Sequence, residues 1–351
     1  MAKERIVSAT EQTSDEEIVS PSIRPRTLDE YVGQSALKER LDIALRAARQ
    51  RNKPMEHVLL HGPPGLGKTT LAFVIAAELG SHASVTSGPA LTKAGDLVGT
   101  LTRMQDRDVL FIDEIHRLPA AVEEYIYPAM EDYRIDFTVD SGMHAKVVTI
   151  NLKAFTLIGA TTRPGLLTQA LRTRFGITHH LGFYPQSDLL AILSRACGIM
   201  DVGRVGQGAL NMIASRSRGT PRVALRLLRR VHDFAIVRGD GKVVEATVEA
   251  ALQLESVDSL GLDALDRSYL RTLATVYEGG PVGVEALAAT IGEDGGTLED
   301  VVEPFLLQSG FVARTRQGRR ITRAGAEHIG AAFRSEQIDE KDDGPPPLFG
   351  G

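Results

Sequence analysis

The sequence predicts a parallel α/β domain, followed by a small all-helical domain and a shorter α+β domain. Between residues 34 and 184, short β-rich apolar runs alternate with helical patterns, and strands separated by helices favour a parallel sheet. From Asp188 to about Glu255 only helical periodicity is present. After Asp258 the pattern changes to three helices and then two short strands around a tight turn, which is a winged-helix outline.

Changes of pattern along the chain define the predicted domains. The two ends are polar or rich in Pro and Gly, without periodicity, and are expected to be disordered. The expected parts are a tail 1–20, the α/β domain 21–186 with an inserted hairpin 131–152, the helical domain 187–257, the winged helix 258–335, and a tail 336–351.

Composition limits the function classes. The chain has 351 residues, of which 43% are hydrophobic and 24% charged, enough for two or three cores. No apolar run approaches the ~20 residues of a membrane span, and the polar start lacks a signal peptide, so a cytoplasmic protein without membrane contact is expected. The single cysteine, Cys197, excludes internal disulfides and is assigned to core packing. Because the net charge is −5, any contact with DNA must depend on local basic patches.

The stretch HGPPGLGKTT at 61–70 matches a phosphate-binding loop. Gly62, four intervening residues and then Gly67-Lys68-Thr69 follow the strand HVLL and precede an apolar helix. Glycines let backbone N–H groups approach phosphate oxygens, and the helix N-terminus adds the positive end of its dipole. Lys68 is expected at the β and γ phosphates, and the Thr69 hydroxyl at Mg²⁺.

A pair of acids distinguishes hydrolysis from phosphoryl transfer. The run DVLFIDEIH, 108–116, is a buried strand that ends in Asp113-Glu114. Asp113 at the carboxyl end of the strand is placed to hold Mg²⁺, and Glu114 to polarise the attacking water. The stretch Asn52-Lys53-Pro54-Met55 lacks the Asp of a guanine-reading motif and precedes the loop, which favours adenine.

Further residues extend the predicted site. The strand FTLIGA ends before Thr161-Thr162, where a polar side chain can sense the γ-phosphate. The stretch LRTRFG follows, and if Arg174 faces outward, it supplies an arginine finger to a neighbouring subunit, worth ~10³ to 10⁵ in rate. A contact of that kind repeats head to tail and produces a ring or a filament.

The stretch RGTPRVALRLLRR predicts a helix with Thr220 as N-cap and Pro221 at its first position. Its apolar stripe packs into the helical domain. The members of this stripe are Ala224, Leu227, Leu228, Val231 and Ala235. Arg222 at the helix N-terminus is unfavourable against the dipole, which favours an external anion there, the γ-phosphate of ATP.

Residues 131–152 predict a β-hairpin. Tyr133, Ile135, Phe137 and Val139 share one face, a Ser-Gly turn follows, and Val148, Ile150 and Leu152 return. Because an isolated hairpin is marginal in water, its apolar face needs a partner. On the residues alone, packing on its own domain and docking to another protein remain equally open.

The C-terminal run FVARTRQGRRITR predicts two strands around a Gln-Gly turn, with clustered arginines. The cluster comprises Arg314, Arg316, Arg319, Arg320 and Arg323. Such a concentration on an acidic chain favours phosphate contact over a solvated wing. Because no aromatic residues accompany the arginines, tracking of the DNA backbone without base readout is expected.

These motifs, in this order, resemble the AAA+ ATPases. The strings IRPRTLDEYVGQ, GPPGLGKTTLA, TSGPAL, FIDEIHRL, GATTRPGLL, LRTRFGI and RGTPRVALRLLRR are similar, over about residues 20–335, to the RuvB family of bacterial Holliday-junction branch-migration motors. The turn T-R-Q-G-R departs from the commoner T-P-R-G-R of that family.

The resemblance implies roles for individual residues. It implies catalytic roles for Lys68, Asp113, Glu114, Thr161 in sensor 1, Arg174 as the trans finger, and Arg222 as sensor 2. It implies nucleotide contacts at Ile23, Arg24, Gly62, Gly65, Gly67, Lys68, Thr69, Thr70, Glu131, Asp132, Tyr133, Tyr184 and Arg222, with Mg²⁺ at Thr69 and Asp113. It implies DNA contacts at Arg314, Arg316 and Arg319, and partner contacts at Ile135, Phe137, Val148 and Ile150.

The implied activity is ATP hydrolysis that drives branch migration in DNA recombination and repair. The resemblance implies a homohexameric ring around duplex DNA at Holliday junctions. It also implies a RuvA-type junction-binding partner, docked on the hairpin, and a RuvC-type resolving nuclease.

Two other classes of protein remain possible. Another AAA+ remodeller, such as a clamp loader or a protein unfoldase, shares the nucleotide chemistry, but an unfoldase presents aromatic pore loops that the sequence does not show. A winged-helix regulator with a vestigial loop is disfavoured, because Lys68, Asp113, Glu114 and Arg174 are all present.

Overall fold

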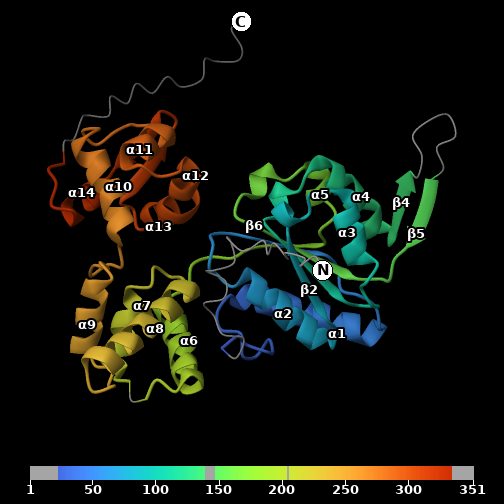
Figure 1. Cartoon of the computed structure of the whole chain (residues 1–351), viewed down its shortest axis with the longest axis horizontal. Coiled ribbons are helices and arrows are strands. Elements are labelled where there is room, and N and C mark those ends of the chain that lie inside the picture. Colours follow the sequence, from blue (N-terminus) through green and yellow to red (C-terminus); the bar gives the residue numbers. More distant parts are fainter. Residues whose placement is uncertain (1–22, 139–146, 204, 334–351) are drawn as a thin grey trace, which may run out of the picture. The chain divides into compact units, whose positions relative to one another are not determined.

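The computed structural model describes residues 23–138, 147–203 and 205–333 (Figure 1). Contacts within the chain divide it into two compact units, Met1–Leu262 and Asp263–Gly351. The tails predicted at 1–20 and 336–351, and the predicted Ser-Gly turn of the hairpin, lie outside the described residues. Among the helices of the described part, none combines the length and apolarity required to cross a bilayer.

A five-stranded parallel sheet forms the centre of the first unit, in the order β2-β3-β6-β1-β7. The strands are β1 Val58–His61, β2 Ala83–Ser87, β3 Val109–Asp113, β6 Thr156–Thr161 and β7 Ile177–His180. The predicted parallel sheet is therefore confirmed. Because β6 lies between β1 and β3, the phosphate-loop strand and the acid-bearing strand flank the strand that ends in Thr161.

Side chains alternate between the two faces of this sheet and enter two separate cores. Leu60 and Phe111 pack with helices on one face, whereas Leu59 and Leu110 pack with helices on the other. Figure 1 shows α1 Ser35–Arg51 and α2 Lys68–Leu79 on one side, and α3 Ala94–Leu101, α4 Ala120–Glu131 and α5 Gln169–Arg172 on the opposite side. Each large apolar side chain that is fully buried in this way stabilises the fold by ~1.5–3 kcal/mol.

Four helices follow the sheet and pack together as a bundle (Figure 1). They are α6 Gln186–Met200, α7 Gln207–Ser215, α8 Pro221–Arg238 and α9 Glu245–Leu254. The predicted stripe of α8 is buried in this bundle, from Ala224 to Ala235. Cys197 is half-buried and packs against the same core.

Thr220 occupies the predicted N-cap position of α8, but its hydroxyl does not cap the helix. Thr220 Oγ1 instead donates to the Arg218 carbonyl at 3.1 Å. An orphan amide of the first turn finds a different acceptor, because Arg222 N–H bonds to the Gly65 carbonyl oxygen at 3.3 Å. The helix start is therefore tied to the phosphate loop by backbone atoms.

The inserted hairpin pairs β4 Arg134–Thr138 with β5 Val147–Asn151 in antiparallel register. Ile135 is fully buried against its own domain, beside α4, so this part of the hairpin has its partner within the chain. Tyr133 precedes the strand with a left-handed φ of 52° and meets the edge of Phe155. Val148 is 40% exposed, Ile150 is half-buried, and the Phe137 side chain lies outside the described residues.

The second unit is a helical core closed by a two-stranded wing. Its helices are α10 Ala264–Thr275, α11 Val284–Ile291, α12 Gly295–Thr297, a π-helical turn Leu298–Val302, α13 Glu303–Gln308 and α14 Arg323–His328. The strands β8 Val312–Thr315 and β9 Gly318–Ile321 pair antiparallel.

The wing turns one residue earlier than the predicted Gln-Gly turn. Arg316 and Gln317 form the turn, and Gly318 opens β9 with a φ of 138°. A Cβ at Gly318 would lie 2.4 Å from the Val282 carbonyl oxygen. The close approach of this backbone explains why glycine stands there.

Candidate functional site

The phosphate loop joins β1 to α2 through glycines in left-handed conformations. Gly62, Gly65 and Gly67 have φ values of 139°, 77° and 92°. A Cβ at Gly65 would lie 2.8 Å from Thr220 Cγ2, and a Cβ at Gly62 would lie 2.4 Å from the Leu181 carbonyl oxygen. The conformation and the close packing both exclude larger residues, as a loop that wraps phosphate with its backbone requires.

Lys68 is buried at the first position of α2. Its Nζ donates to the carbonyl oxygens of Gly62 at 2.8 Å and Pro63 at 2.9 Å. Burial lowers the pKa of Lys68, while the nearby carboxylates of Asp113 and Glu114 act in the opposite direction. The loop therefore holds a desolvated cation at the helix N-terminus, where a polyphosphate gains most from it.

The acidic pair lies at the carboxyl end of β3. Asp113 Oδ1 accepts a hydrogen bond from the Glu114 amide at 2.9 Å. Glu114 has a left-handed backbone with φ 46°, and its carboxylate lies 3.2 Å from His116 Nδ1. Sequence reasoning gave His116 no role. The only signal for it was its place two residues after Glu114.

Thr161 is fully buried at the end of β6, and its side chain points to His116. Thr161 Oγ1 lies 2.8 Å from His116 Nδ1 and accepts a hydrogen bond from the Arg163 amide at 3.0 Å. Thr161 does not line the cavity described next. The Thr161 hydroxyl thus contacts His116, which also contacts Glu114.

A cavity of about 850 Å³ lies over the phosphate loop. Its wall contains most of the residues predicted at the nucleotide. These are Ile23, Arg24, Gly65, Gly67, Lys68, Thr69, Thr70, Asp113, Glu114, Tyr184 and Arg222. Gly62, Thr161, Arg174, Glu131, Asp132 and Tyr133 lie outside this wall. A volume of this size suits a nucleotide.

Tyr31 is a cavity residue that sequence reasoning missed. Its hydroxyl lies 2.9 Å from that of Tyr184, and Tyr184 Oη donates to the Leu66 carbonyl at 3.2 Å. Burial, together with the contact between the two phenols, raises the pKa of Tyr31 well above its usual value. The pair joins the segment before α1, the start of the helical bundle and the phosphate loop through neutral hydroxyls.

The wall beyond the tyrosines carries basic groups from several elements. Arg24 stacks over the Phe73 ring at 5.1 Å, and its carbonyl accepts from Arg195 at 3.3 Å. Arg195 also pairs with Glu30 at 3.0 Å. Arg117 and Arg222 line the cavity too. The cavity wall therefore carries positive charge from several elements, as an anionic ligand requires.

Arg174 lies away from this cavity, in a cluster with the end of α4. Its guanidinium pairs with Glu131 at 3.2 Å, stacks over the Tyr127 ring at 4.3 Å and donates to the Ala170 carbonyl at 2.6 Å. The side chain is 22% exposed. Two predicted nucleotide residues, Arg174 and Glu131, are thus brought together at a surface separate from the cavity of their own chain.

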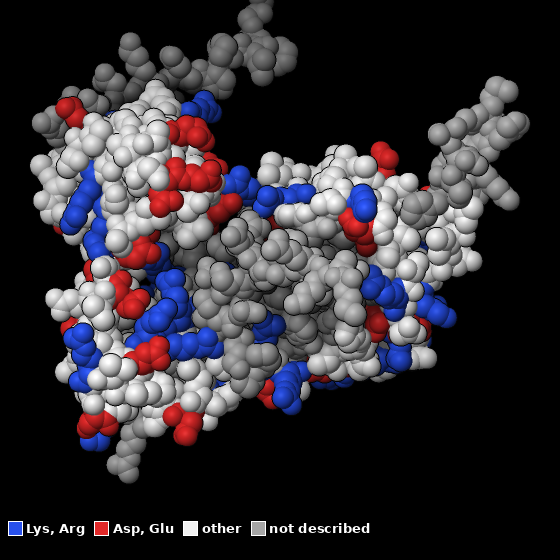
Figure 2. Space-filling view, in the orientation of Figure 1, with Lys and Arg blue, Asp and Glu red and all other residues white. Residues whose placement is uncertain are grey.

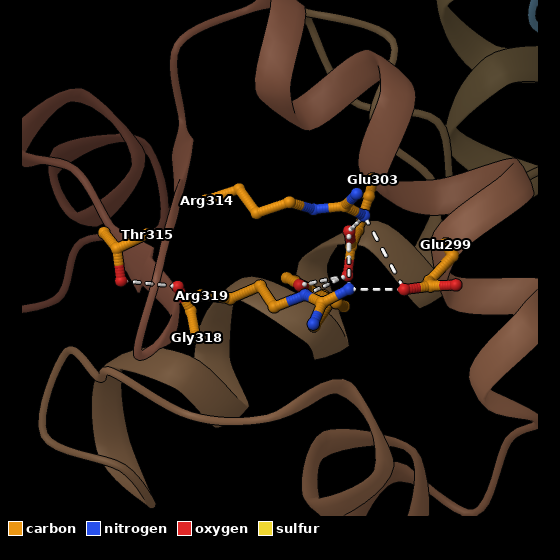
Figure 3. A network of polar contacts seen from close by, with 7 residues as sticks. Glu299, Glu303, Arg314, Thr315, Gly318 and Arg319 are labelled. Atoms are coloured by element: carbon orange, nitrogen blue, oxygen red, sulfur yellow. Dashed lines mark hydrogen bonds and ion pairs between the residues drawn. The ribbon is translucent and has the colours of Figure 1, made fainter. Parts of the chain in front are cut away.

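The wing arginines converge on a buried carboxylate (Figure 3). Arg319 Nε donates to Glu303 at 2.9 Å and Arg319 Nη2 to Glu299 at 2.6 Å, while Arg314 also pairs with Glu303. The Tyr269 hydroxyl donates to Glu303 at 3.0 Å. The Glu303 side chain is fully buried, Arg319 is 12% exposed and Arg314 is 48% exposed.

These contacts separate the arginines that sequence reasoning had grouped. Although burial opposes its charge, the bonds to Glu303 raise the pKa of Arg319, and Arg319 is largely committed to the domain interior. Arg314 and Arg316 are the more exposed cations of the wing. Figure 2 shows basic and acidic side chains interspersed over the described residues of the viewed face.

Family models cover nearly all of the described chain. Residues 23–181 match the P-loop domain of the Holliday junction DNA helicase RuvB, residues 184–258 match the RuvB AAA lid domain, and residues 259–330 match the RuvB C-terminal winged helix domain.

Relatives and solved structures agree with these matches. The chain is 49% identical over 320 residues to the Holliday junction branch migration complex subunit RuvB of Pseudothermotoga lettingae, covering 91% of this chain and 93% of that protein. The structure resembles that of the Thermotoga maritima RuvB branch migration motor with a TM-score of 0.81, 47% identity, and coverage of 89% and 100%. A mutant of the same motor matches with a TM-score of 0.82, 47% identity, and coverage of 89% and 99%.

Arg319→Ala is expected to destabilise the winged helix by about 3 kcal/mol, because it leaves the buried Glu303 carboxylate short of a partner. Arg314→Ala removes a half-exposed cation and is expected to cost under about 1 kcal/mol. Amide hydrogen exchange in α13 and β9 of the full chain measures both losses. Equal losses for the two variants would show that Arg319 has no special structural role.

Proposed function

This chain belongs to the RuvB family, and we propose that it is an ATP-driven motor that moves the branch point of Holliday junctions during DNA recombination and repair. The observation that carries the proposal is the coincidence of two features. All three domains match RuvB models, and one cavity gathers Lys68, Asp113 and Glu114. Another AAA+ remodeller is disfavoured, because the lid and winged-helix matches are specific to RuvB. We propose that this work takes place in the cytoplasm.

ATP is the proposed ligand of the cavity. Ile23, Arg24 and Tyr184 are proposed to enclose the adenosine, and the loop from Gly62 to Thr70 to hold the phosphates. Arg222 is the second residue of α8 and lies beside Gly65, so its side chain is proposed to reach the γ-phosphate as sensor 2. We propose that Thr161 acts as sensor 1 through His116, because its hydroxyl faces that ring.

Mg²⁺ is proposed to bind beside the phosphates, at Thr69 and Asp113. Both supply oxygen ligands and both line the cavity. No cluster of three or more His, Cys, Asp or Glu residues that suits a metal occurs among the described residues. This fits Mg²⁺, which commonly takes one or two protein oxygens and completes its shell with water and substrate phosphates. When bound, it neutralises charge that develops on the phosphate oxygens.

Glu114 is proposed as the residue that orients and polarises the attacking water. It lines the same cavity as Lys68, and its carboxylate acts to raise the pKa of Lys68. Glu114→Gln keeps the shape of the side chain but removes its basicity. We expect this variant to bind ATP normally and to hydrolyse it about 10² to 10⁴ times more slowly.

The exposed Glu124→Gln on α4 serves as the matched control and is expected to retain full turnover. Steady-state ATP turnover and binding of a fluorescent ATP analogue measure the two effects. Turnover of Glu114→Gln near that of Glu124→Gln would remove Glu114 as the base.

Arg174 is proposed as an arginine finger that completes the site of a neighbouring subunit. It lies outside the wall of its own cavity and shares a surface with Glu131, Asp132 and Tyr133, which are proposed to approach the same neighbouring nucleotide. A contact between two different surfaces, repeated by rotation, closes a ring. We propose a homohexamer around duplex DNA.

Mixing two inactive variants tests this arrangement. Arg174→Ala lacks the finger and Lys68→Ala lacks the phosphate-binding cation, so each is expected to be nearly inactive alone. In a mixture, interfaces that pair an intact Lys68 with an intact Arg174 are expected to restore part of the turnover. Measurement of ATPase activity across mixing ratios would refute a finger in trans if every ratio stayed at the level of the separate variants.

The wing is proposed to contact the DNA backbone through Arg314, Arg316 and Arg319. The first two are exposed, whereas Arg319 also anchors the wing to Glu303. The hairpin is proposed to dock a RuvA-type protein through Phe137, Val148 and Ile150. Ile135 is buried in its own domain, so we propose that it supports this surface and does not contact the partner directly. A RuvC-type nuclease is proposed to act on the same junctions.

Arg314→Ala combined with Arg316→Ala is expected to weaken binding to duplex DNA and to flatten its salt dependence. The slope of log affinity against log salt should fall by about 0.9 for each lost phosphate contact, while Arg319 keeps the wing folded. The control, Arg46→Ala with Arg51→Ala, removes two exposed charges from α1. Equal slopes for the two double variants would place the DNA surface elsewhere.

A further inference from the structure

We infer that His116 is a positioning residue that holds the Glu114 carboxylate, and that Thr161 fixes the His116 ring. This inference rests on the proposed function, because it requires Glu114 to be the base. It assigns the buried His116 ring a task beyond the link to Thr161 proposed above.

The local backbone places these groups together. Glu114 leaves β3 in a left-handed conformation, with φ 46° and ψ 45°, and a 3-10 turn Ile115–Arg117 follows. Gly88 accommodates this turn, since a Cβ there would lie 2.4 Å from the Glu114 carbonyl oxygen. A non-glycine residue persists in this conformation only where its surroundings hold it. This turn of the backbone brings His116 Nδ1 to 3.2 Å from Glu114 Oε2.

Two contacts of His116 Nδ1 indicate where its hydrogen lies. Thr161 Oγ1 is 2.8 Å away and Glu114 Oε2 is 3.2 Å away. If Nδ1 carried no hydrogen, its lone pair would face an ionised carboxylate, and that arrangement is repulsive. Nδ1 is therefore the donor, shared between the Thr161 hydroxyl oxygen and the Glu114 carboxylate.

Thr161 gives the ring its fixed position. The Thr161 side chain is fully buried, and its Oγ1 also accepts from the Arg163 amide at 3.0 Å. The Thr161 carbonyl accepts from the Gly62 amide at 3.2 Å, at the start of the phosphate loop. The His116 side chain is 6% exposed, whereas that of Glu114 is 33% exposed. Thr161, His116 and Glu114 thus form a chain of contacts from the rigid sheet to a carboxylate that lines the cavity.

A donor hydrogen bond at Glu114 Oε2 holds the carboxylate by that oxygen. It also restricts the rotation of a side chain that would otherwise sample several rotamers. Because misplacement of a reacting group by about 1 Å can reduce rate about a hundredfold, the expected effect of losing His116 lies in kcat. Binding of ATP depends on other residues and should not change.

Substitution of His116 by three residues tests the inference. In Asn the amide nitrogen takes the place of Nδ1, whereas in Gln it reaches the place of Nε2, and Ala has neither. We expect His116→Ala to lower kcat between about tenfold and a hundredfold with KM for ATP within about twofold. His116→Asn should recover most of this loss and His116→Gln should not.

Thr161 provides a second, nearly isosteric pair of variants. Thr161→Val removes the hydroxyl that orients the ring and should lower kcat in the same way. Thr161→Ser keeps the hydroxyl and should keep the parental kcat. Affinity for a fluorescent ADP analogue, measured for every variant, establishes that the cavity is folded. A kcat of His116→Ala equal to or above that of the parent would overturn the inference, as would equal recovery by Asn and Gln or a change confined to KM.

Failure of the proposed function gives a different result. If Glu114→Gln itself turned over ATP at the parental rate, Glu114 would not be the base, and the inference about His116 would fail with that assignment. If Glu114→Gln were inactive while His116→Ala remained fully active, Glu114 would stand as the base and the positioning role alone would be wrong.

Discussion

The order of strands in the parallel sheet is the constraint on which the site depends. Parallel strands direct their carboxyl ends to one edge, and with β6 between β1 and β3 that edge gathers the phosphate loop, the acidic pair and Thr161. The register brings His61 opposite Thr161, and the Gly62 amide bonds to the Thr161 carbonyl. Residues separated by about a hundred positions in the chain therefore act as one rigid wall. The catalytic groups need no flexible loop to meet, so their geometry is largely preorganised.

Local chemistry explains which parts were predictable from sequence. The phosphate loop, the buried strands and the stripe of α8 each follow from a short pattern whose physical cause is local: glycine conformation, alternation or helical period. The contacts of His116 and Tyr31 were not predictable in this way. Their partners Thr161 and Tyr184 lie 45 and 153 residues away. Thr220 shows the same limit on a smaller scale. Its position at the N-cap was predicted correctly, but the acceptor for the Arg222 amide in the first turn is the Gly65 carbonyl oxygen, which only the tertiary fold supplies.

The wing shows how burial alters what an arginine cluster means. Counted in the sequence, its cations form a basic patch, but two of them share the carboxylates of Glu299 and Glu303. Burial first, and then the Glu303 carboxylate, raise the pKa of Tyr269, so its phenol remains a neutral donor and adds no charge. The net field is therefore weaker than the cluster suggests. The DNA phosphates proposed above would compete with the carboxylates for Arg314, whereas Glu299 and Glu303 hold Arg319 within the domain.

The role proposed for Arg174 would make hydrolysis depend on assembly. Within its own chain the guanidinium already has a carboxylate, an aromatic face and a carbonyl. A partly exposed ion pair is worth at most about 1 kcal/mol, because water screens it. If Arg174 is the finger proposed above, the γ-phosphate of a neighbouring subunit offers it more charge in a cavity from which water is partly excluded, so the exchange of partners would favour the assembled state. Arg174 Nε is buried without a hydrogen-bond partner among the described residues, so the proposed move to a phosphate would also satisfy this group and would delay turnover until subunits assemble. On this proposal the same exchange would link each ATP site to the position of its neighbour, as the proposed ring around DNA requires.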